Sequence, residues 1–153
     1  MPPDAEPGTG QTRGPTASER AAESRAVVDR ALTLVGDRNY DEASEYIAPE
    51  LRGVVREFAE LTHDVFPDLD VTLEDTIAEG DKVVYRWSAR GTHQGTARYR
   101  TLGEVQGTGG RIEVQGITIL QVADGKIVRT WGVTDEAAGL EQLGLLRSPS
   151  VYG

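Results

Sequence analysis

The stretch that decides the fold is GITILQVADGKIVRTWGVTD, residues 116–135. Two runs rich in β-branched residues flank the dipeptide Asp124-Gly125, which is typical of a tight turn between antiparallel strands. The stretch therefore predicts a β-hairpin. On its return strand, Trp131 and Asp135 lie four residues apart and so share one face, with the acid at the strand end. A carboxylate beside an indole at the mouth of a sheet is a candidate acid/base site.

The register of this hairpin decides which side chains accompany the acid. A two-residue loop puts Thr118 opposite Trp131. A three-residue loop with a bulge puts Ile117 opposite Trp131 instead. A one-residue slip exchanges every side chain on a face, and the hairpin sequence leaves both registers open. In the bulged register, Ile119 and Gln121 share the face of Trp131.

The chain before the hairpin changes from helical periodicity to alternation near Pro67, which cannot continue a helix. Ser18 and Asp41 are candidate N-caps of the first two helices. Helices followed by a largely antiparallel sheet indicate the α+β class, with the helices covering one face of a curved sheet. The expected helices are 18–36, 41–47, 49–64 and 136–146, and the expected strands before the hairpin are 71–77, 83–93 and 97–105.

Composition narrows the class of protein. The chain has 153 residues, which suits one domain. The absence of cysteine excludes disulfides and thiolate metal sites. A net charge of −9 argues against nucleic acid and anionic membranes as partners, and no apolar run is long enough to span a bilayer. We expect a cytoplasmic domain over 18–147, a disordered N-terminal tail over 1–17 without a signal peptide, and a C-terminal tail over 148–153.

Five short motifs follow one another along the chain: FPDL (66–69), AEGDKVV (78–84), GTHQG (91–95), DGKIV (124–128), and Trp131 with Asp135 and QLG (142–144). Each motif is unspecific alone, but the five in this order and spacing are specific. Together they resemble the SnoaL-like polyketide cyclases of the nuclear transport factor 2-like superfamily. The similarity covers about 18–146, and it does not specify a substrate.

The resemblance implies a cone-shaped, strongly curved mixed sheet that is packed on N-terminal helices around a single apolar pocket. It implies a homodimer or homotetramer. The founding members close a ring by intramolecular aldol condensation without metal or cofactor. In them an Asp at the end of the last strand is the acid/base catalyst, and Asp135 falls on that position. They also carry polar His or Gln residues on the preceding strand, which favours the bulged register and makes Gln121 a catalytic candidate.

Each candidate group also has a structural interpretation. The residues alone favour a helix N-cap over a catalyst as the role of Asp135. The resemblance favours the catalyst instead, and both roles can coexist. In an apolar pocket beside Trp131, its pKa would be raised by desolvation. His93 shares a strand face with Tyr85 and Trp87. It is either a pocket acid or, as we favour, a group that satisfies a buried hydrogen bond at the strand end.

The remaining site predictions concern substrate and metal. Only two histidines are present, thirty residues apart, and no facial-triad spacing occurs, so neither metal nor cofactor is expected. The sequence contains no motif for a serine or cysteine nucleophile and no phosphate-binding loop. The expected substrate-binding residues are Trp131, Phe66, Trp87, Tyr85, Phe58 and Ile119.

These features favour a cofactor-free cyclase of secondary metabolism, for example antibiotic biosynthesis, of the lyase or isomerase type. Its partner would be an apolar, polyketide-like small molecule. An epoxide hydrolase or epoxide-opening cyclase of the same fold is an alternative; Arg86 and Arg129 are available for it, but a second carboxylate on the pocket face is not evident. A non-catalytic small-molecule-binding module, with Asp135 only as a cap, is the third alternative.

Overall fold

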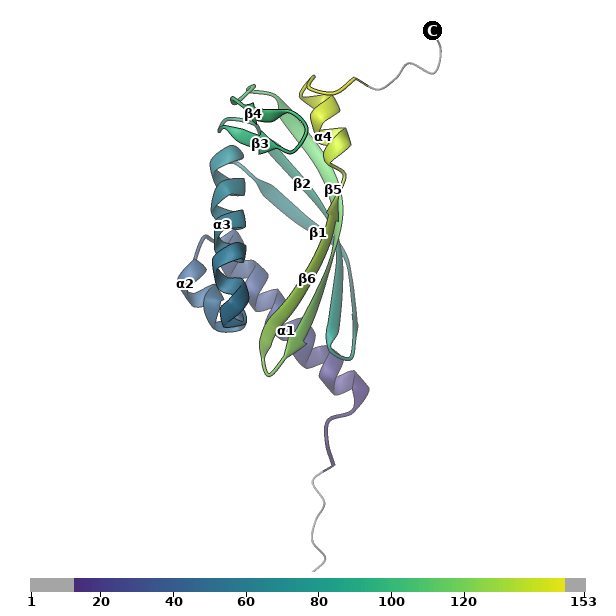
Figure 1. Ribbon diagram of the computed structural model, residues 1–153. Helices are drawn as coiled ribbons and strands as arrows, with labels where there is room; N and C mark the ends of the chain where they lie inside the picture. Colours follow the sequence, from purple (N-terminus) through teal and green to yellow (C-terminus); the bar gives the residue numbers. More distant parts are fainter. Residues whose placement is uncertain (1–12, 148–153) are drawn as a thin grey trace, which may run out of the picture.

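The computed structural model describes residues 13–147, and in it helices lie on the concave side of a curved sheet (Figure 1). The expected α+β class is confirmed. Of the predicted tails, 148–153 and most of 1–17 lie outside the described residues. The helical elements are α1 (Ala17–Gly36), α2 (Tyr40–Ala43), the 3-10 turn η1 (Ser44–Tyr46), α3 (Pro49–Val65) and α4 (Glu136–Gln142). The strands are β1 (Asp70–Glu79), β2 (Lys82–Thr92), β3 (Ala97–Tyr99), β4 (Gly103–Val105), β5 (Arg111–Ala123) and β6 (Lys126–Thr134).

The main sheet has the strand order β1-β2-β5-β6, and each neighbouring pair is antiparallel. A parallel pairing also occurs within residues 13–147, as an isolated bridge between Ile47 and Ile127. The strand predicted over 97–105 is instead the small hairpin β3-β4, which lies at the end of the sheet above α3 (Figure 1). None of the helices within residues 13–147 is both long and apolar enough to cross a membrane.

The first two helices begin earlier than predicted, because the chain uses other caps. Thr16 caps α1: its side chain accepts from the backbone N–H of Glu19, while the Glu19 carboxylate accepts from the Thr16 backbone. Asn39 caps α2 by accepting from the backbone N–H of Glu42. Both caps have an acidic residue three positions later, a pairing that supports the N-terminal turn and that Ser18 lacks.

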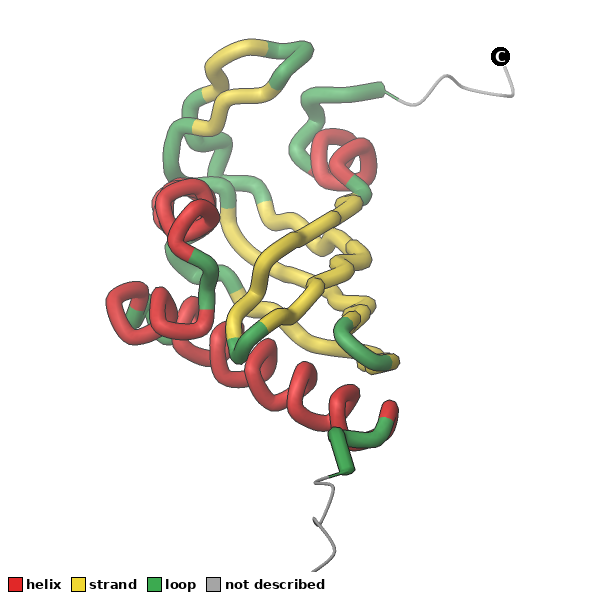
Figure 2. Tube along the Cα trace, turned by 60° about the horizontal axis from the view of Figure 1, so that its bottom comes forward, coloured by secondary structure: helices red, strands yellow, loops and turns green. Residues whose placement is uncertain are grey.

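Helix α1 crosses the concave side and contacts all four strands of the main sheet. Its buried residues Val28 and Ala31 pack on Val83 and Tyr85 of β2 and on Leu120 of β5. This contact defines the concave face: odd-numbered residues of β2 and even-numbered residues of β5 point towards the helices. Figure 2 shows the N-terminal helices together beside the strands, and the short C-terminal helix α4 apart from them at the end of the sheet.

The turn of the β5-β6 hairpin closes with two residues, and the bulge lies elsewhere. Ala123 pairs with Lys126, and the intervening Asp124-Gly125 has φ angles of 50° and 72°, as a tight turn with two left-handed residues requires. A bulge in β6 follows, so Ile119 lies opposite Trp131. The predicted three-residue loop and the predicted partner of Trp131 are therefore wrong. The prediction that Trp131 shares a face with Ile119 and Gln121 is confirmed, because the bulge adds one residue.

Candidate functional site

The face that carries Trp131 is the convex face of the sheet. Trp131 pairs with Ile119, Ile119 pairs with Val84, and Val84 pairs with Ile77. Because Val83 next to Val84 packs against α1, this row points away from the helices. Trp131 is 45% exposed there. The expectation that Trp131 and Ile119 line a pocket on the helical side is therefore corrected.

Asp135 lies at the junction of β6 and α4. Its Oδ1 accepts from the backbone N–H of Ala138 at 3.1 Å, which makes it the N-cap of α4. Its own backbone N–H donates to the carbonyl of Gln115 at 2.9 Å and extends the sheet by one residue. The predicted cap is confirmed, and the carboxylate is at the exposed rim of the fold.

Gln121 does not accompany Asp135. Its side-chain amide donates to Asp81 Oδ2 at 2.6 Å, in the turn between β1 and β2. This hydrogen bond holds the pKa of the Asp81 carboxyl below its ordinary value. Along β5, Gln121 is six residues from Gln115, where Asp135 joins the sheet, which corresponds to about 20 Å of strand. The two side chains cannot act on the same bond.

His93 is fully buried just beyond the end of β2, on the concave side. Its Nδ1 lies 3.1 Å from Thr108 Oγ1, and its backbone N–H donates to the Gly110 carbonyl. Its ring packs on Phe66 with a centroid separation of 5.8 Å. Burial lowers the pKa of His93, and its Nε2 has no hydrogen-bond partner within residues 13–147. The structural role that we favoured is visible, and one ring nitrogen remains unused by the described chain.

Tyr85 and Trp87 both point to the concave side, but they bind different elements of the fold. The Tyr85 hydroxyl donates to Asp29 Oδ1 of α1 at 2.7 Å, and burial raises the pKa of Tyr85. Tyr85 is therefore a core anchor. The Trp87 indole N–H donates to Thr118 Oγ1 at 3.0 Å, which fixes the ring across β5.

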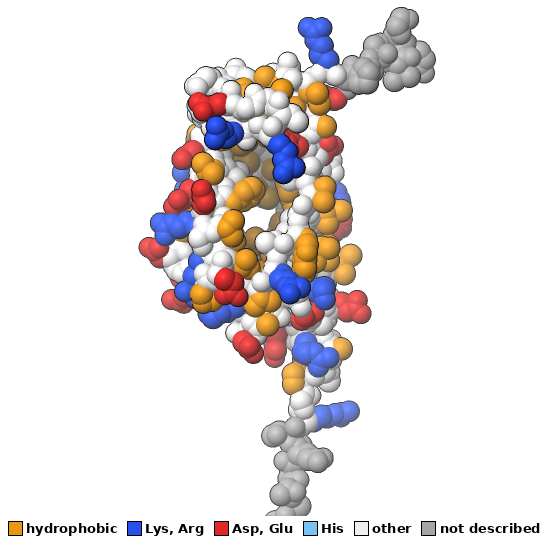
Figure 3. Space-filling view, viewed as in Figure 1, with side chains coloured by type: hydrophobic (Ala, Val, Ile, Leu, Met, Phe, Trp, Pro, Cys, Tyr) orange, Lys and Arg blue, Asp and Glu red, His pale blue; other side chains and the backbone are white. Residues whose placement is uncertain are grey.

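A hollow separates α3 from β6 (Figure 3). Exposed apolar side chains follow one stripe of α3, where Phe58 is 72% exposed. On the other side, the concave residues of β6 are small and exposed. Figure 3 shows hydrophobic side chains along the border of the hollow. The α3 stripe is Val54, Phe58 and Leu61, and the facing residues of β6 are Thr130, Gly132 and Thr134.

The hollow offers apolar contact and few proton-transfer groups. Within residues 13–147, the concave faces of β2, β5 and β6 carry one titratable side chain, Tyr85. His93, the residue after β2, adds a second. No group of three or more His, Asp or Glu residues in positions 13–147 is arranged to hold a metal ion. This arrangement can hold an apolar molecule in a fixed conformation. Tyr85 is engaged by Asp29 of α1, and the other acid/base groups, His93 and Asp135, lie towards the end of the sheet near β3-β4 and α4.

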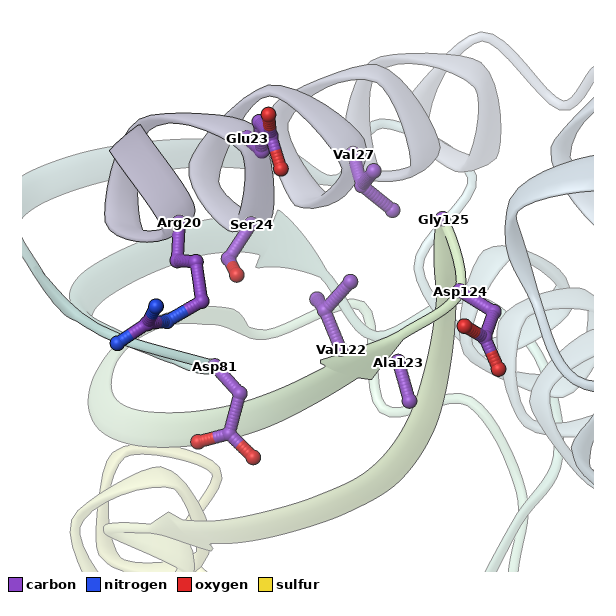
Figure 4. Close-up of a pocket in the computed structure, with 9 residues that line it drawn as sticks. All are labelled: Arg20, Glu23, Ser24, Val27, Asp81, Val122, Ala123, Asp124 and Gly125. Carbon is purple, nitrogen blue, oxygen red and sulfur yellow. The ribbon is translucent and has the colours of Figure 1, made fainter. Parts of the chain in front are cut away.

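A separate depression of about 200 Å³ lies between the first half of α1 and the turns at Asp81 and Asp124 (Figure 4). Two of its polar groups already serve the fold. Ser24 donates to the Gly80 carbonyl at 2.9 Å, and Asp81 accepts from Gln121. We therefore place the candidate site in the hollow and not here.

Three residues of the hollow were missed by the sequence analysis: Thr118, Thr130 and Gly132. They belong to the even-numbered set of β5 and β6, which lies opposite the face predicted to line the pocket. One signal was available. Glycine inside a strand often marks a close approach of a ligand or of another backbone, and Gly132 interrupts an otherwise β-branched and aromatic strand.

Comparison with known proteins agrees with this architecture. The family profile of the SnoaL-like polyketide cyclases matches residues 20–143, so the chain belongs to this family. AclR, a hydroxylase candidate from Streptomyces galilaeus, is 25% identical with a TM-score of 0.70, and the match covers 86% of this chain and 87% of AclR. IdmH, a polyketide cyclase candidate from Streptomyces antibioticus, is 25% identical with a TM-score of 0.66, and the match covers 79% and 98% of the two chains.

A SnoaL-like polyketide cyclase candidate from Jannaschia sp. CCS1 shows the same fold at 21% identity, with a TM-score of 0.69 and coverage of 90% and 100%. No curated protein matches the sequence. Family membership and these structural relatives support a role of the polyketide cyclase type. Small-molecule binding of a polyketide kind is the corresponding expectation for the hollow.

Proposed function

We propose that this chain is a cofactor-free cyclase that closes a ring in a polyketide-like intermediate of secondary metabolism. The observation that carries the proposal is the hollow between the apolar stripe of α3 and the concave face of β6, in a member of a cyclase family. Phe58 and Trp87 provide apolar surface for the substrate. Holding the two reacting ends of a flexible chain together supplies a large part of the acceleration.

Asp135 is the proposed proton-transfer group, and it acts at the rim of the hollow. By alternation it belongs to the convex face with Trp131, but β6 ends at Thr134, and the helix α4 that Asp135 caps leads to Leu143, which packs against the concave cluster of β5. The helix cap uses Oδ1, and within the described residues Oδ2 has no hydrogen bond, so one oxygen is free to accept a proton. The carboxylate removes a carbon-bound proton made acidic by flanking carbonyls. The new carbon–carbon bond forms at the second carbonyl, and the proton then returns to the resulting alkoxide.

His93 is the second candidate for proton transfer. Its backbone N–H donates to the carbonyl of Gly110, the residue before β5. Gly110 is five residues from Gln115, so about 16 Å of extended chain separates the points where His93 and Asp135 join the sheet. The two groups therefore cannot form a hydrogen-bonded pair. His93 would need Thr108 or Phe66 to move before a substrate could reach its Nε2, because the side chain is fully buried.

A hydroxylase-type reaction is the second candidate function. It is favoured by the scarcity of titratable groups in the hollow and by the similarity to AclR. In that case the protein would mainly bind and orient a substrate that takes one oxygen atom from dissolved dioxygen, while the other atom leaves as water with two electrons from a reductant in solution, and Asp135 would act only as a cap.

The mass of the product distinguishes these functions. The purified protein would be incubated in air, with and without ascorbate as reductant, with a linear poly-β-keto ester, an uncyclised aromatic polyketide acid and an aryl epoxide. The products would be analysed by mass spectrometry in ¹⁶O and ¹⁸O water. An aldol cyclisation leaves the mass unchanged or removes one water. Addition of one oxygen would favour the hydroxylase, and addition of labelled water would favour epoxide hydrolysis. Turnover that depends on an added metal would contradict the cofactor-free cyclase.

A further inference from the structure

Two glycines lie on neighbouring strands of the concave face for different reasons. A Cβ on Gly116 would lie 2.2 Å from Cζ2 of Trp87, so the indole occupies the space of that side chain. A Cβ on Gly132 would meet nothing closer than Thr118 Oγ1 at 3.6 Å and the Ile117 carbonyl at 3.8 Å. The described chain therefore explains Gly116 but leaves the space at Gly132 unused.

Glycine is unfavourable inside a strand, because it increases the backbone entropy lost on folding and provides no side chain to pack. Gly132 has no left-handed φ angle that would require glycine. Its backbone is exposed on the side of β6 that faces the hollow. These facts point to a ligand that approaches the backbone of β6 at this position.

The surroundings of Gly132 indicate which kind of ligand fits. Thr118 is the cross-strand partner of Gly132 and binds the Trp87 indole, so the ring is held beside the bare backbone. Thr130 and Thr134 lie on either side of Gly132 on the same face, about 13 Å apart along the strand. Their hydroxyl groups have no hydrogen bond within residues 13–147, and each can donate or accept one.

We propose that Gly132 keeps open a slot in which a flat, oxygen-bearing ring system lies against the backbone of β6, next to the Trp87 indole. The threonine hydroxyls bind oxygen substituents along the edge of the ring system. This inference rests on the proposed function, since the ring system would be the substrate or product of the cyclase. It identifies Gly132 as the residue that sets the shape of substrate the hollow accepts.

The two tryptophans give a direct measurement. The chain contains only Trp87 and Trp131, which lie on opposite faces of the sheet. In a Trp131→Phe variant, emission therefore reports on the hollow alone. Alizarin, a flat dihydroxylated tricycle, is the probe. We expect alizarin to quench Trp87, and we expect Gly132→Val in this background to weaken its binding at least about tenfold, because the added methyl groups occupy the slot.

Loss of folding would not explain this result. Valine is favoured over glycine in strands, so the melting temperature of Gly132→Val should stay the same or rise. Gly132→Ala should weaken binding by a smaller factor, and Thr130→Val, which removes a hydroxyl at constant shape, by about threefold. Dodecanoate, a flexible chain, is the matched probe: any affinity that it has should not change with Gly132→Val.

Several outcomes would overturn the slot. The first is an alizarin affinity that is equal in Gly132→Val and its parent. The second is no binding of alizarin to the parent. The third is that alizarin quenches Trp131 in a Trp87→Phe variant but does not quench Trp87 in the Trp131→Phe variant. The slot and the cyclase can fail separately. Turnover that Gly132→Val leaves unchanged would remove the slot and keep the cyclase. Alizarin binding that Gly132→Val abolishes, without turnover of any polyketide, would keep the slot and remove the cyclase.

Discussion

At the scale of the residue, Asp135 has two roles that substitutions can separate. Asparagine caps a helix about as well as aspartate but cannot accept the proton. We therefore expect Asp135→Asn to abolish cyclisation and to change the free energy of unfolding by less than about 0.5 kcal/mol. Asp135→Ala should lose activity and also about 1 kcal/mol of stability, because the N–H of Ala138 loses its partner.

The measurements are turnover and urea unfolding of the same preparations. Asp135→Ser provides the matched control, since serine restores the cap without restoring the base. If Asp135→Asn keeps full turnover while Asp135→Ala is destabilised, the residue is a cap only. The hydroxylase alternative would then gain weight.

The burial of His93 predicts how the free energy of unfolding depends on pH. Burial lowers the pKa of His93 in the folded state, so the folded protein holds fewer protons than the unfolded chain near pH 6. Its contribution is therefore fully present above the ordinary histidine pKa of about 6.5 and is lost as the pH falls below it. We expect the urea midpoint to decrease between pH 7 and pH 5.

Burial lowers the pKa of His63 as well, so His63 contributes to the pH dependence of stability in the same direction. Single variants distinguish the two. His93→Asn should flatten the pH profile in part, since asparagine can still face Thr108 but does not titrate, and His63→Asn should flatten it in part as well. An unchanged profile in His93→Asn would show that the buried ring does not control this pH dependence.

At the scale of the element, the β2-β5 pair depends on the fit of Trp87 over Gly116. A methyl group on Gly116 would lie within the indole ring, so Gly116→Ala should cost about 1–3 kcal/mol of stability. Combined with Trp87→Phe, the same substitution should cost less, with a coupling energy of about 1 kcal/mol. Gly132→Ala is the control, because its Cβ has room, and should lie within about 0.5 kcal/mol of the parent. Equal costs for the two alanines would contradict this packing.

The sequence predicts the elements well where a strong local signal exists. The start of α3 at Pro49 and the position of the turn at Asp124-Gly125 follow from residues with special backbone preferences. Helix α1 ends at Gly36 as predicted, but the left-handed residue beyond it is Arg38, with a φ angle of 60°, and not the glycine. The β6 bulge could not be predicted, because it depends on tertiary contacts. Ile127 is buried against the core on the concave face, whereas Trp131 lies on the convex face. Residues four apart on a regular strand share a face, so the chain needs one extra residue between them.

The candidate site was predicted less well, for a reason that periodicity cannot overcome. Alternation shows which residues share a face but not which face meets the helices. In β5 the choice is ambiguous, because Leu120 and Val122 on one face and Ile117 and Ile119 on the other are all apolar. The position of Asp135 was found because a cap and a strand end are local features, whereas the hollow arises from elements far apart in the chain.

At the scale of the whole molecule, the convex face is an apolar surface that helices do not cover. Its apolar residues form a continuous patch over all four strands of the main sheet. Two ion pairs lie beside the patch, Arg86 with Asp75 at 2.6 Å and Arg90 with Glu113 at 3.2 Å, whereas Arg129, two residues before Trp131 on the same face, has no ion pair within residues 13–147. A second copy could cover the patch without separating either ion pair, although the net charge of each chain is −9. The patch consists of Ile77, Val84, Ile117, Ile119, Trp131 and Val133.

A homodimer through this convex patch is our last prediction. Val133 is 76% exposed, so Val133→Lys should leave the monomer stable but place like charges opposite each other across a two-fold interface. We expect a dimer for the parent and a monomer for Val133→Lys by sedimentation velocity, and a tighter parent dimer at higher salt, because salt screens the repulsion between acidic chains. Val54→Lys is the matched control: Val54 is 58% exposed but lies on the α3 stripe, so this variant should weaken alizarin binding and stay dimeric. A dimer that survives Val133→Lys but dissociates in Val54→Lys would show that copies meet through α3, and the hollow would then be an interface rather than a substrate site.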